Sequence, residues 1–168
     1  GGNVAVDVAI TAKRMGAASV TMACLEAEGE MPASEEEIGR AREEGITILP
    51  SWGPKEILRD GKDIVGLTLK RCTSVFDEKG RFSPIYDENE TSTLHGSSIL
   101  MAVGQKTDLS FLGEDMELEV NRGLISVEPS TMKTSMDKVF AVGDVTTGPK
   151  TVVGAIADGK KASVAVHS

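Results

Sequence analysis

The chain has 168 residues, of which 40% are hydrophobic, 26% are charged and only 4% are aromatic, and its formal net charge is −8. This composition predicts a soluble globular protein of one domain or two small ones, and the acidic balance excludes a nucleic-acid partner, whose phosphates need a basic face. No apolar run approaches the roughly 18 residues of a membrane span and no signal peptide opens the chain, so we expect a cytoplasmic protein without membrane contact.

The composition also bears on the fold class and on redox chemistry. With few aromatics and 18 glycines, the sequence favours an α/β sheet over an aromatic-rich β sandwich. The two cysteines, Cys24 and Cys72, are far apart and form no C-x-x-C motif. A disulfide scaffold, a zinc site and a dithiol redox centre are therefore unsupported.

The first residues, GGNVAVDVAITAKRMGA, predict glycines followed directly by a helix that stops near Gly16. Residues 19–25 (SVTMACL) then predict a short buried parallel strand. A dinucleotide fingerprint, G-x-G-x-x-G/A, needs a strand before its first glycine; here Gly1 takes the x position, Gly2 the second glycine and Ala5 the close-packing position. We expect the first glycine and its strand upstream, which makes the sequence a fragment with an unpaired sheet edge and a tendency to self-associate.

A second helix and another strand follow. Ser34 and Glu37 form a capping-box pattern, and Gly45 suits the end of the helix. Residues 46–50 predict a strand that ends at a proline. Residues 51–62 predict a loop, because they carry Gly-Pro and Asp-Gly turn signals.

From residue 63 the hydrophobic pattern alternates. Residues 63–94 predict a β-meander of antiparallel strands with a DEKG turn, in which RFSPIY and TSTLH are separate strands. Residues 97–104 (SSILMAVG) form a nearly continuous apolar run and predict a buried central strand. Short strands, LEV and LISV, are expected around Asn121-Arg122-Gly123.

The last stretch, residues 139–162, predicts an apolar strand, a Gly143-Asp144 corner, a Gly/Pro loop and a helix rich in small residues. Such a corner can place the Asp144 carboxylate and a row of backbone N–H groups beside a polyol or phosphate, because the strand ends where the helix begins. The alternative is an ordinary strand-turn-helix in which Asp144 is only a cap.

Several motifs together resemble one family. VFAVGD followed by a TVV helix resembles the second flavin-binding motif of flavoproteins that have two dinucleotide-binding domains. With EMPAS (residues 30–34) and AVGQKTD (residues 102–108), it is similar to the C-terminal half of the glutamate synthase small-subunit family of FAD and pyridine-nucleotide oxidoreductases. This resemblance covers nearly all of the chain.

The resemblance implies a Rossmann-like three-layer NAD(P)-binding domain with a β-meander over residues 1–103, and the C-terminal part of an FAD-binding domain over residues 104–168. The intact enzyme is expected to pass hydride between NAD(H) and FAD and to relay electrons to a partner subunit or to iron–sulfur centres. No catalytic side chain and no metal ligand are expected, and the isolated fragment is expected to be inactive.

The candidate cofactor-binding residues fall into two groups. Those for the pyridine nucleotide are Gly1, Gly2, Asn3 and Val4 at the first helix, and Glu26, whose carboxylate would bind the adenosine ribose hydroxyls. Those that the resemblance implies for FAD are Gly104, Gly143, Asp144 beside the ribityl chain, and Thr151, Val152 and Val153 facing the flavin ring.

One departure from the family affects the cofactor preference. Members that use NADPH typically carry two arginines after the second strand, where this chain has Leu25 and Glu26. A carboxylate repels a 2′-phosphate and accepts hydrogen bonds from a free diol, so the sequence predicts NAD(H) over NADP(H).

Two other classes of protein remain open. A stand-alone nucleotide-binding regulatory module would bind NAD(H) without yellow colour and without redox activity. A purely structural interaction protein would not be stabilised by any nucleotide against thermal unfolding.

Overall fold

The structure is a computed structural model that describes residues 1–113 and 116–167. The chain divides into two compact units, Gly1–Val103 and Gly104–Ser168. The helices in the described part of the chain are too short or too polar to cross a membrane.

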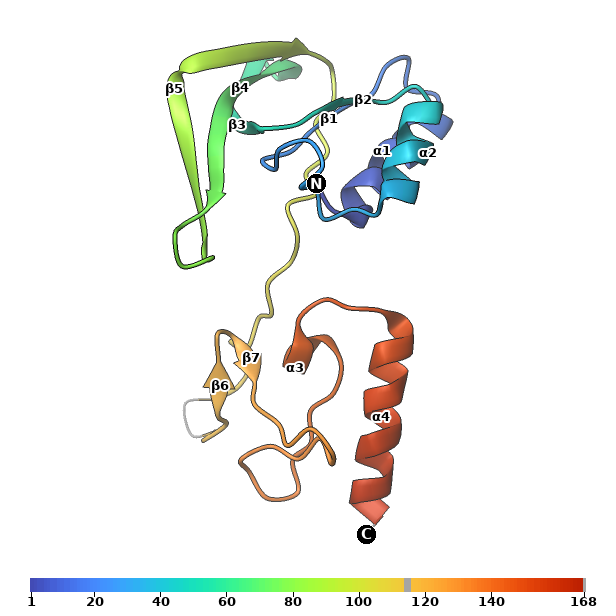
Figure 1. The fold of residues 1–168 in the computed structure, drawn as a ribbon, viewed down its shortest axis with the longest axis vertical. Helices are drawn as coiled ribbons and strands as arrows, with labels where there is room; N and C mark the ends of the chain where they lie inside the picture. The colour runs from blue at the N-terminus through green and yellow to red at the C-terminus, as the bar shows by residue number, and fades with distance from the viewer. Residues whose placement is uncertain (114–115, 168) are drawn as a thin grey trace. The chain divides into compact units, whose positions relative to one another are not determined.

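The first unit begins with two helices and a parallel pair of strands. Helix α1 (Asn3–Arg14) precedes β1 (Thr21–Ala23), and α2 (Glu35–Glu43) precedes β2 (Thr47–Leu49). Strand β1 pairs with β2 in parallel, with Met22 opposite Ile48 (Figure 1). Buried side chains of α1, α2, β1 and the adjoining loops form one core cluster of this unit: Val6, Ala9, Ile10, Met22, Ala33, Ala41 and Ile46.

The helix boundaries in this unit confirm the predictions made from capping residues. Ser34 is the N-cap of α2, and its hydroxyl oxygen accepts a hydrogen bond from the Glu37 amide at 3.3 Å. Gly45 (φ 75°) and Gly16 (φ 103°) lie just past the ends of α2 and α1, in the left-handed conformation that glycine adopts without strain.

The β-meander is confirmed, but its first strand was predicted as a loop. Strands β3 (Trp52–Asp60), β4 (Asp63–Phe76) and β5 (Phe82–His95) form an antiparallel sheet in the order β3-β4-β5 (Figure 1). The loop prediction for residues 51–62 was wrong over Trp52–Asp60, whereas the predicted Asp-Gly turn signal falls at the turn between β3 and β4. Proline is tolerated at position 54 because β3 is an edge strand whose pairing is irregular between Pro54 and Glu56.

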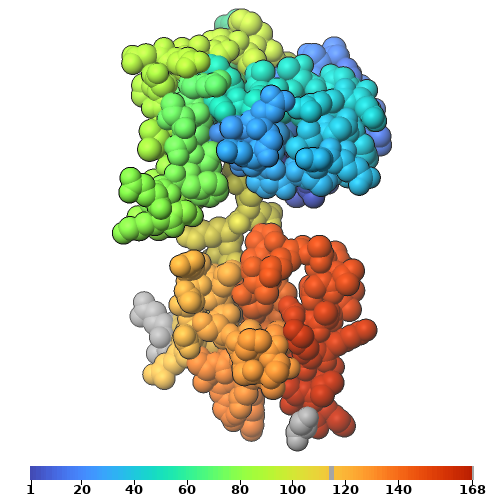
Figure 2. Space-filling model, viewed as in Figure 1, coloured from blue at the N-terminus to red at the C-terminus, as the bar shows by residue number. Residues whose placement is uncertain are grey.

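The β4–β5 hairpin is longer than the sequence predicted. RFSPIY and TSTLH belong to one strand, β5, whose pairing with β4 shifts register after Lys70 and absorbs the polar residues between the two motifs. The Phe76 and Phe82 rings meet edge to face at the turn, with centroids 6.3 Å apart. Figure 2 shows this turn, in green, as a projection from the first unit.

The predicted central strand at residues 97–104 is not formed. These residues are in no helix or strand, and Leu100, Met101 and Val103 are 62–80% exposed. A strand needs hydrogen-bonded neighbours, and in the described residues the parallel sheet contains only β1 and β2. Both this segment and β1 line one cavity of about 590 Å³, so the apolar run lies near the sheet without pairing to it.

The second unit contains little regular structure before its last helix. Short strands were predicted on either side of Asn121-Arg122-Gly123, and strands β6 (Val120–Asn121) and β7 (Leu124–Ile125) form there as an antiparallel pair. The turn between them places Arg122 (φ 52°) and Gly123 (φ 81°) in the left-handed region. Helix α3 (Asp144–Thr147) and helix α4 (Val152–His167) follow. The predicted strand over residues 139–142 is not formed. In the described residues this segment makes only a single β-bridge, between Lys133 and Phe140.

Candidate functional site

The first candidate site is the N-terminus of α1. Gly2 is its N-cap, with extended backbone (φ −85°, ψ 175°), and the Gly2 carbonyl accepts hydrogen bonds from the Ala5 and Val6 amides at 2.9 and 3.3 Å. The Asn3 and Val4 amides have no partner among the described residues, as the geometry of a helix start requires. Free N–H groups at a helix N-terminus attract anions, and phosphates above all.

The structure brings Glu26 to this same helix N-terminus. The Glu26 carboxylate oxygen Oε2 lies 3.3 Å from the Gly1 nitrogen, and the side chain is only 16% exposed. That oxygen is buried and has no hydrogen-bond partner among the described groups. The Glu26 carbonyl accepts a hydrogen bond from the Ser51 amide at 2.8 Å, which anchors its backbone at the end of β1.

The two glycines before α1 differ in the space around them. A Cβ atom on Gly1 would lie 2.6 Å from Glu26 Oε2, the end of a long side chain, and 3.1 Å from the Cβ atom of Cys24, so a side chain there would be tightly packed against both residues. A Cβ atom on Gly2 would meet nothing within 4 Å. The open space over Gly2, together with the free amides beside it, fits a ligand that carries a phosphate.

Asn3 and Val4, both predicted as cofactor-binding, lie in the first turn of α1. Val4 is 70% exposed. The Asn3 side chain already has a partner in the protein: its Oδ1 atom accepts a hydrogen bond from the Ser34 amide at 2.9 Å. Sequence reasoning missed this contact, although the EMPAS motif that contains Ser34 was a signal that the segment matters.

The two cysteines are buried, free thiols. Burial raises the pKa of Cys24, and the nearby Glu26 carboxylate raises it further. Burial likewise raises the pKa of Cys72. Both groups are therefore held as neutral thiols, which are poor nucleophiles.

The second candidate site is the corner at Gly143 and Asp144. Gly143 has φ 70° and ψ −146°, a backbone conformation that favours glycine, and a Cβ atom there would be in ordinary contact with the Cβ of Ala155 on α4 at 3.4 Å. The hydroxyls of Thr146 and Thr147 donate to the Gly143 carbonyl at 2.8 and 3.3 Å. The Asp144 carboxylate accepts from the Lys150 amide at 3.4 Å, a long hydrogen bond that leaves most of its capacity free.

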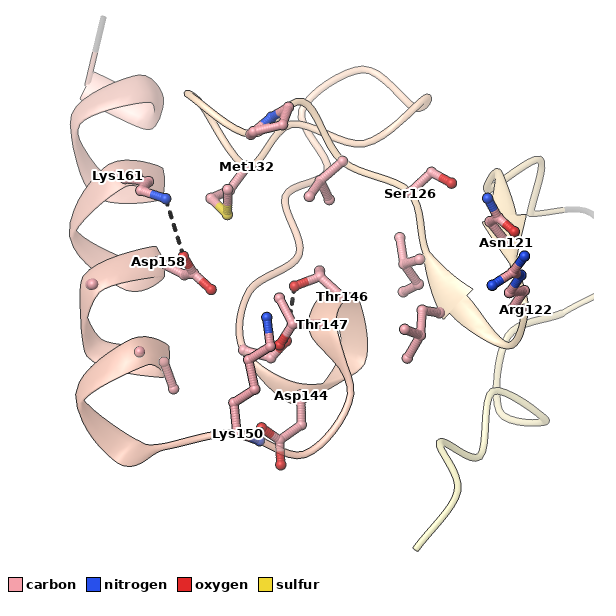
Figure 3. Close-up of a pocket in the computed structure, with 18 residues that line it drawn as sticks. Asn121, Arg122, Ser126, Met132, Asp144, Thr146, Thr147, Lys150, Asp158 and Lys161 are labelled. Carbon is pink, nitrogen blue, oxygen red and sulfur yellow. Dashed lines mark hydrogen bonds and ion pairs between the residues drawn. The ribbon is translucent and has the colours of Figure 1, made fainter. Parts of the chain in front are cut away.

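Asp144 borders a cavity of about 800 Å³ that lies wholly in the second unit. Figure 3 shows Asp144 and Lys150 together at one end of this cavity, the Asp158–Lys161 ion pair (3.3 Å) on α4, and Asn121 and Arg122 on the β6–β7 turn. Carboxylates, ammonium groups and a guanidinium thus surround a mainly apolar space. Its lining residues include Ser126, Pro129, Met132, Gly154 and Ala157.

The structure gathers only part of the predicted flavin site. Gly143 and Asp144 line the cavity, whereas Thr151, Val152, Val153 and Gly104 do not. The Thr151 hydroxyl accepts a hydrogen bond from the Gly154 amide at 3.2 Å, and Val152 and Val153 are 76% and 75% exposed at the start of α4. Gly104 has φ 84° and nothing within 4 Å of its Cβ position.

Sequence reasoning missed several residues of this cavity. Arg122 and Lys150 are cations that line it, and Met132 lies in its wall with φ 61° and 4% exposure. The Asn-Arg-Gly turn signal was visible in the sequence, but only the fold shows that Asn121 and Arg122 line the same cavity as Asp144. An aspartate carboxylate beside cations and an apolar wall fits a polyol-bearing ligand such as FAD.

Sequence comparisons identify related proteins. The family model for pyridine nucleotide-disulphide oxidoreductases matches residues 1–159. The chain is 38% identical over 168 residues to the NADP(+)-dependent formate dehydrogenase subunit beta of Moorella thermoacetica, covering 99% of this chain and 24% of that protein. It is 34% identical to the glutamate synthase [NADPH] small chain of Azospirillum brasilense, covering 100% of this chain and 35% of that protein.

A third relative is named for the other pyridine nucleotide. The chain is 35% identical to the NAD-dependent dihydropyrimidine dehydrogenase subunit PreT of Escherichia coli (strain K12), covering 99% of this chain and 35% of that protein. The chain thus spans about a quarter to a third of the length of these curated relatives.

Solved structures confirm the predicted fold class. The thioredoxin reductase of T. acidophilum aligns with a TM-score of 0.80 at 24% identity, over 99% of this chain and 49% of that one. The thioredoxin reductase of Lactococcus lactis aligns with a TM-score of 0.78 at 25% identity, over 99% of this chain and 50% of that one. The Rossmann-like α/β architecture with its meander and the match over residues 1–159 agree, and the chain belongs to the pyridine nucleotide-disulphide oxidoreductase family.

Proposed function

We propose that this chain is part of a flavin-dependent oxidoreductase that binds a pyridine nucleotide in its first unit and FAD in its second. One observation carries the proposal: the free amides of the α1 N-terminus, the open space over Gly2 and the Glu26 carboxylate all lie at the same point of the fold. These are the groups that a dinucleotide needs for its pyrophosphate and its adenosine ribose.

The boundary between the two compact units supports the assignment of one cofactor to each unit. We assign pyridine-nucleotide binding to residues 1–103 and the FAD contacts to residues 104–168, where the chain splits into its two compact units. When both cofactors are bound, they supply hydride exchange between the nicotinamide ring and the flavin. The protein's own groups bind and orient: α1 amides hold phosphate, Glu26 accepts from a ribose diol, and Asp144 accepts from the ribityl hydroxyls.

The nucleotide preference follows from the charge at position 26. Glu26 is a largely buried carboxylate whose Oε2 atom lies 3.3 Å from the Gly1 nitrogen, and it would repel a 2′-phosphate. We therefore propose NAD(H) over NADP(H). The relatives are named for both nucleotides, so the argument rests on Glu26 alone.

A partner for electron transfer is part of the proposal. Two of the relatives are named as subunits, the formate dehydrogenase subunit beta and the PreT subunit. We propose that the enzyme containing this chain likewise passes electrons to a partner subunit or to iron–sulfur centres. A reducing compartment such as the cytoplasm suits its two free thiols.

Exchanging the charge at position 26 tests the nucleotide site. We expect Glu26→Arg to weaken NADH binding and strengthen NADPH binding, each by about tenfold, since one displaced charge contact corresponds to about 1.4 kcal/mol. Isothermal titration calorimetry of both nucleotides measures this. Glu43→Arg, which makes the same charge change on the exposed end of α2, is the control and should change neither affinity.

The outcomes separate the competing functions. An unchanged chain that already prefers NADPH contradicts the charge argument. A chain that saturates with NADH but takes up no FAD and stays colourless favours a regulatory nucleotide-binding module. A chain whose thermal unfolding is unaffected by NADH and by FAD contradicts both cofactor assignments.

A further inference from the structure

The EMPAS segment is a motif that the proposed function leaves without a role. In the structure it lies against the turn at the start of α1. The Ala33 amide donates to the Gly1 carbonyl at 3.1 Å, and the next amide, of Ser34, donates to Asn3 Oδ1 at 2.9 Å. Two consecutive N–H groups of the segment are therefore bonded to the glycine turn and to the first residue of α1.

The same segment also starts α2. The Ser34 backbone N–H donates to Asn3 while the Ser34 hydroxyl accepts from the Glu37 amide as the helix cap. Ala33 is 6% exposed and packs in the core with Val6 of α1. Backbone and side-chain hydrogen bonds thus join the start of α1 to the start of α2, and residues next to both starts pack in the same core cluster.

We propose that residues 33–34 and the Asn3 side chain form a strap that fixes the α1 N-terminus in the orientation a pyrophosphate needs. The Asn3 side chain is then a positioning group and not a cofactor ligand, while the Asn3 backbone amide stays free for the phosphate. The proposal rests on the proposed nucleotide-binding function of this turn. Such a strap matters because free helix amides bind phosphate only when their N–H bonds point at it. A turn of two glycines is flexible and does not hold that direction by itself. Fixing the turn before the ligand arrives lowers the entropy cost of binding.

Four substitutions separate the strap from the helix cap. Asn3→Ala removes the acceptor, and Asn3→Asp keeps an oxygen in its place. Ser34→Pro removes the N–H donor at a residue whose φ of −65° proline can adopt. Because Ser34→Pro also removes the capping hydroxyl, Ser34→Ala, which removes the hydroxyl alone, is its matched control.

The binding experiment uses ADP-ribose, which carries a pyrophosphate, and adenosine, which carries none. We expect Asn3→Ala and Ser34→Pro each to weaken ADP-ribose binding about tenfold in calorimetry and to leave adenosine within about twofold. The double variant should be no weaker than either single one, because both remove the same bond. Ser34→Ala should bind ADP-ribose like the unchanged chain.

Amide hydrogen exchange of the nucleotide-free chain provides the second measurement. Asn3→Ala should speed exchange at Ser34 and at Ala5 and Val6, whose amides bond to Gly2, and Asn3→Asp should restore the protection. Fast exchange at Ser34 in the unchanged chain would overturn the strap whether or not a nucleotide binds. Equal losses of affinity for ADP-ribose and adenosine, or additive losses of affinity in the double variant, would also overturn the strap. Failure of the unchanged chain to bind ADP-ribose would instead count against the nucleotide site itself.

Discussion

At the scale of single residues, the neighbouring glycines before α1 have different physical roles. Gly1 is closely surrounded, since a side chain there would pack tightly against Cys24 and would displace the Glu26 carboxylate. Gly2 is not needed for packing, because the space over it is open. Open space beside free helix amides is what a phosphate-binding site requires.

Substitutions at the two glycines should therefore have opposite effects. Gly1→Ala should lower the free energy of unfolding by about 1 kcal/mol through overpacking against Glu26 and Cys24. Gly2→Ser should leave stability unchanged, since serine is a favourable N-cap, yet weaken NADH binding by filling the open space. Urea denaturation and calorimetry measure the pair, and a stable Gly1→Ala or a Gly2→Ser that binds NADH normally would contradict this division of roles.

At the scale of elements, the turn of the long β4–β5 hairpin is held by one carboxylate. Asp77 accepts hydrogen bonds from the amides of Lys79 and Arg81, each at 2.9 Å, and pairs with the Arg81 guanidinium at 2.7 Å. The hydrogen bonds from Arg81, with a smaller contribution from Lys79, lower the pKa of Asp77 below its ordinary value. The exposed Phe76–Phe82 pair lies directly beside this turn.

The turn should loosen in acid. Because the pKa of Asp77 is lower in the folded hairpin, its contribution to stability is present above the ordinary aspartate pKa and is lost as the pH falls through the lowered one. Amide exchange of Lys79 and Arg81 should therefore rise in that pH range, relative to the intrinsic rate. In Asp77→Asn, the amides of Lys79 and Arg81 should be less protected from exchange at neutral pH, and their protection should not change in acid. If their protection in this variant falls in acid as it does in the unchanged chain, a group other than Asp77 is responsible.

At the scale of the whole molecule, the two compact units are unequally packed. The first has a core in which Val6 and Ala41 are completely buried. In the second, α4 buries none of its described residues, and Val152, Val153 and Ile156 are 55–76% exposed. A helix that buries no apolar face gains little from tertiary structure.

Native-state hydrogen exchange should show this difference. We expect amides in the middle of α4 to exchange at least a hundredfold faster than those of Val6 and Ile10 in α1, roughly 3 kcal/mol in opening free energy. The control lies within the second unit, where the Ala141 amide, bonded to the Met132 carbonyl at 3.1 Å, should be better protected than α4. Equal protection of α4 and α1 would mean that α4 is covered in solution.

Much of the local structure could be predicted from the sequence because its causes are local. The Ser34 cap, the Gly16 and Gly45 helix stops and the β6–β7 turn follow from side chains within a few residues of each element. The predictions that were wrong concern segments whose structure depends on whether a neighbouring strand is available for pairing. Within the predicted loop, Trp52–Asp60 forms a strand because it pairs with β4, and residues 97–104 are irregular because they have no paired neighbour in the described structure.

The sequence by itself determined the family of this protein and the kinds of groups at its candidate sites, because the Gly-rich start, Glu26 and the Gly143-Asp144 corner are local patterns. Only the tertiary structure decided which groups meet. It placed Glu26 Oε2 3.3 Å from the Gly1 nitrogen, and it brought Asn3 Oδ1 within hydrogen-bond distance of the Ser34 amide. Such contacts join residues far apart along the chain, and their formation depends on how helices and strands pack, which no short stretch of sequence encodes.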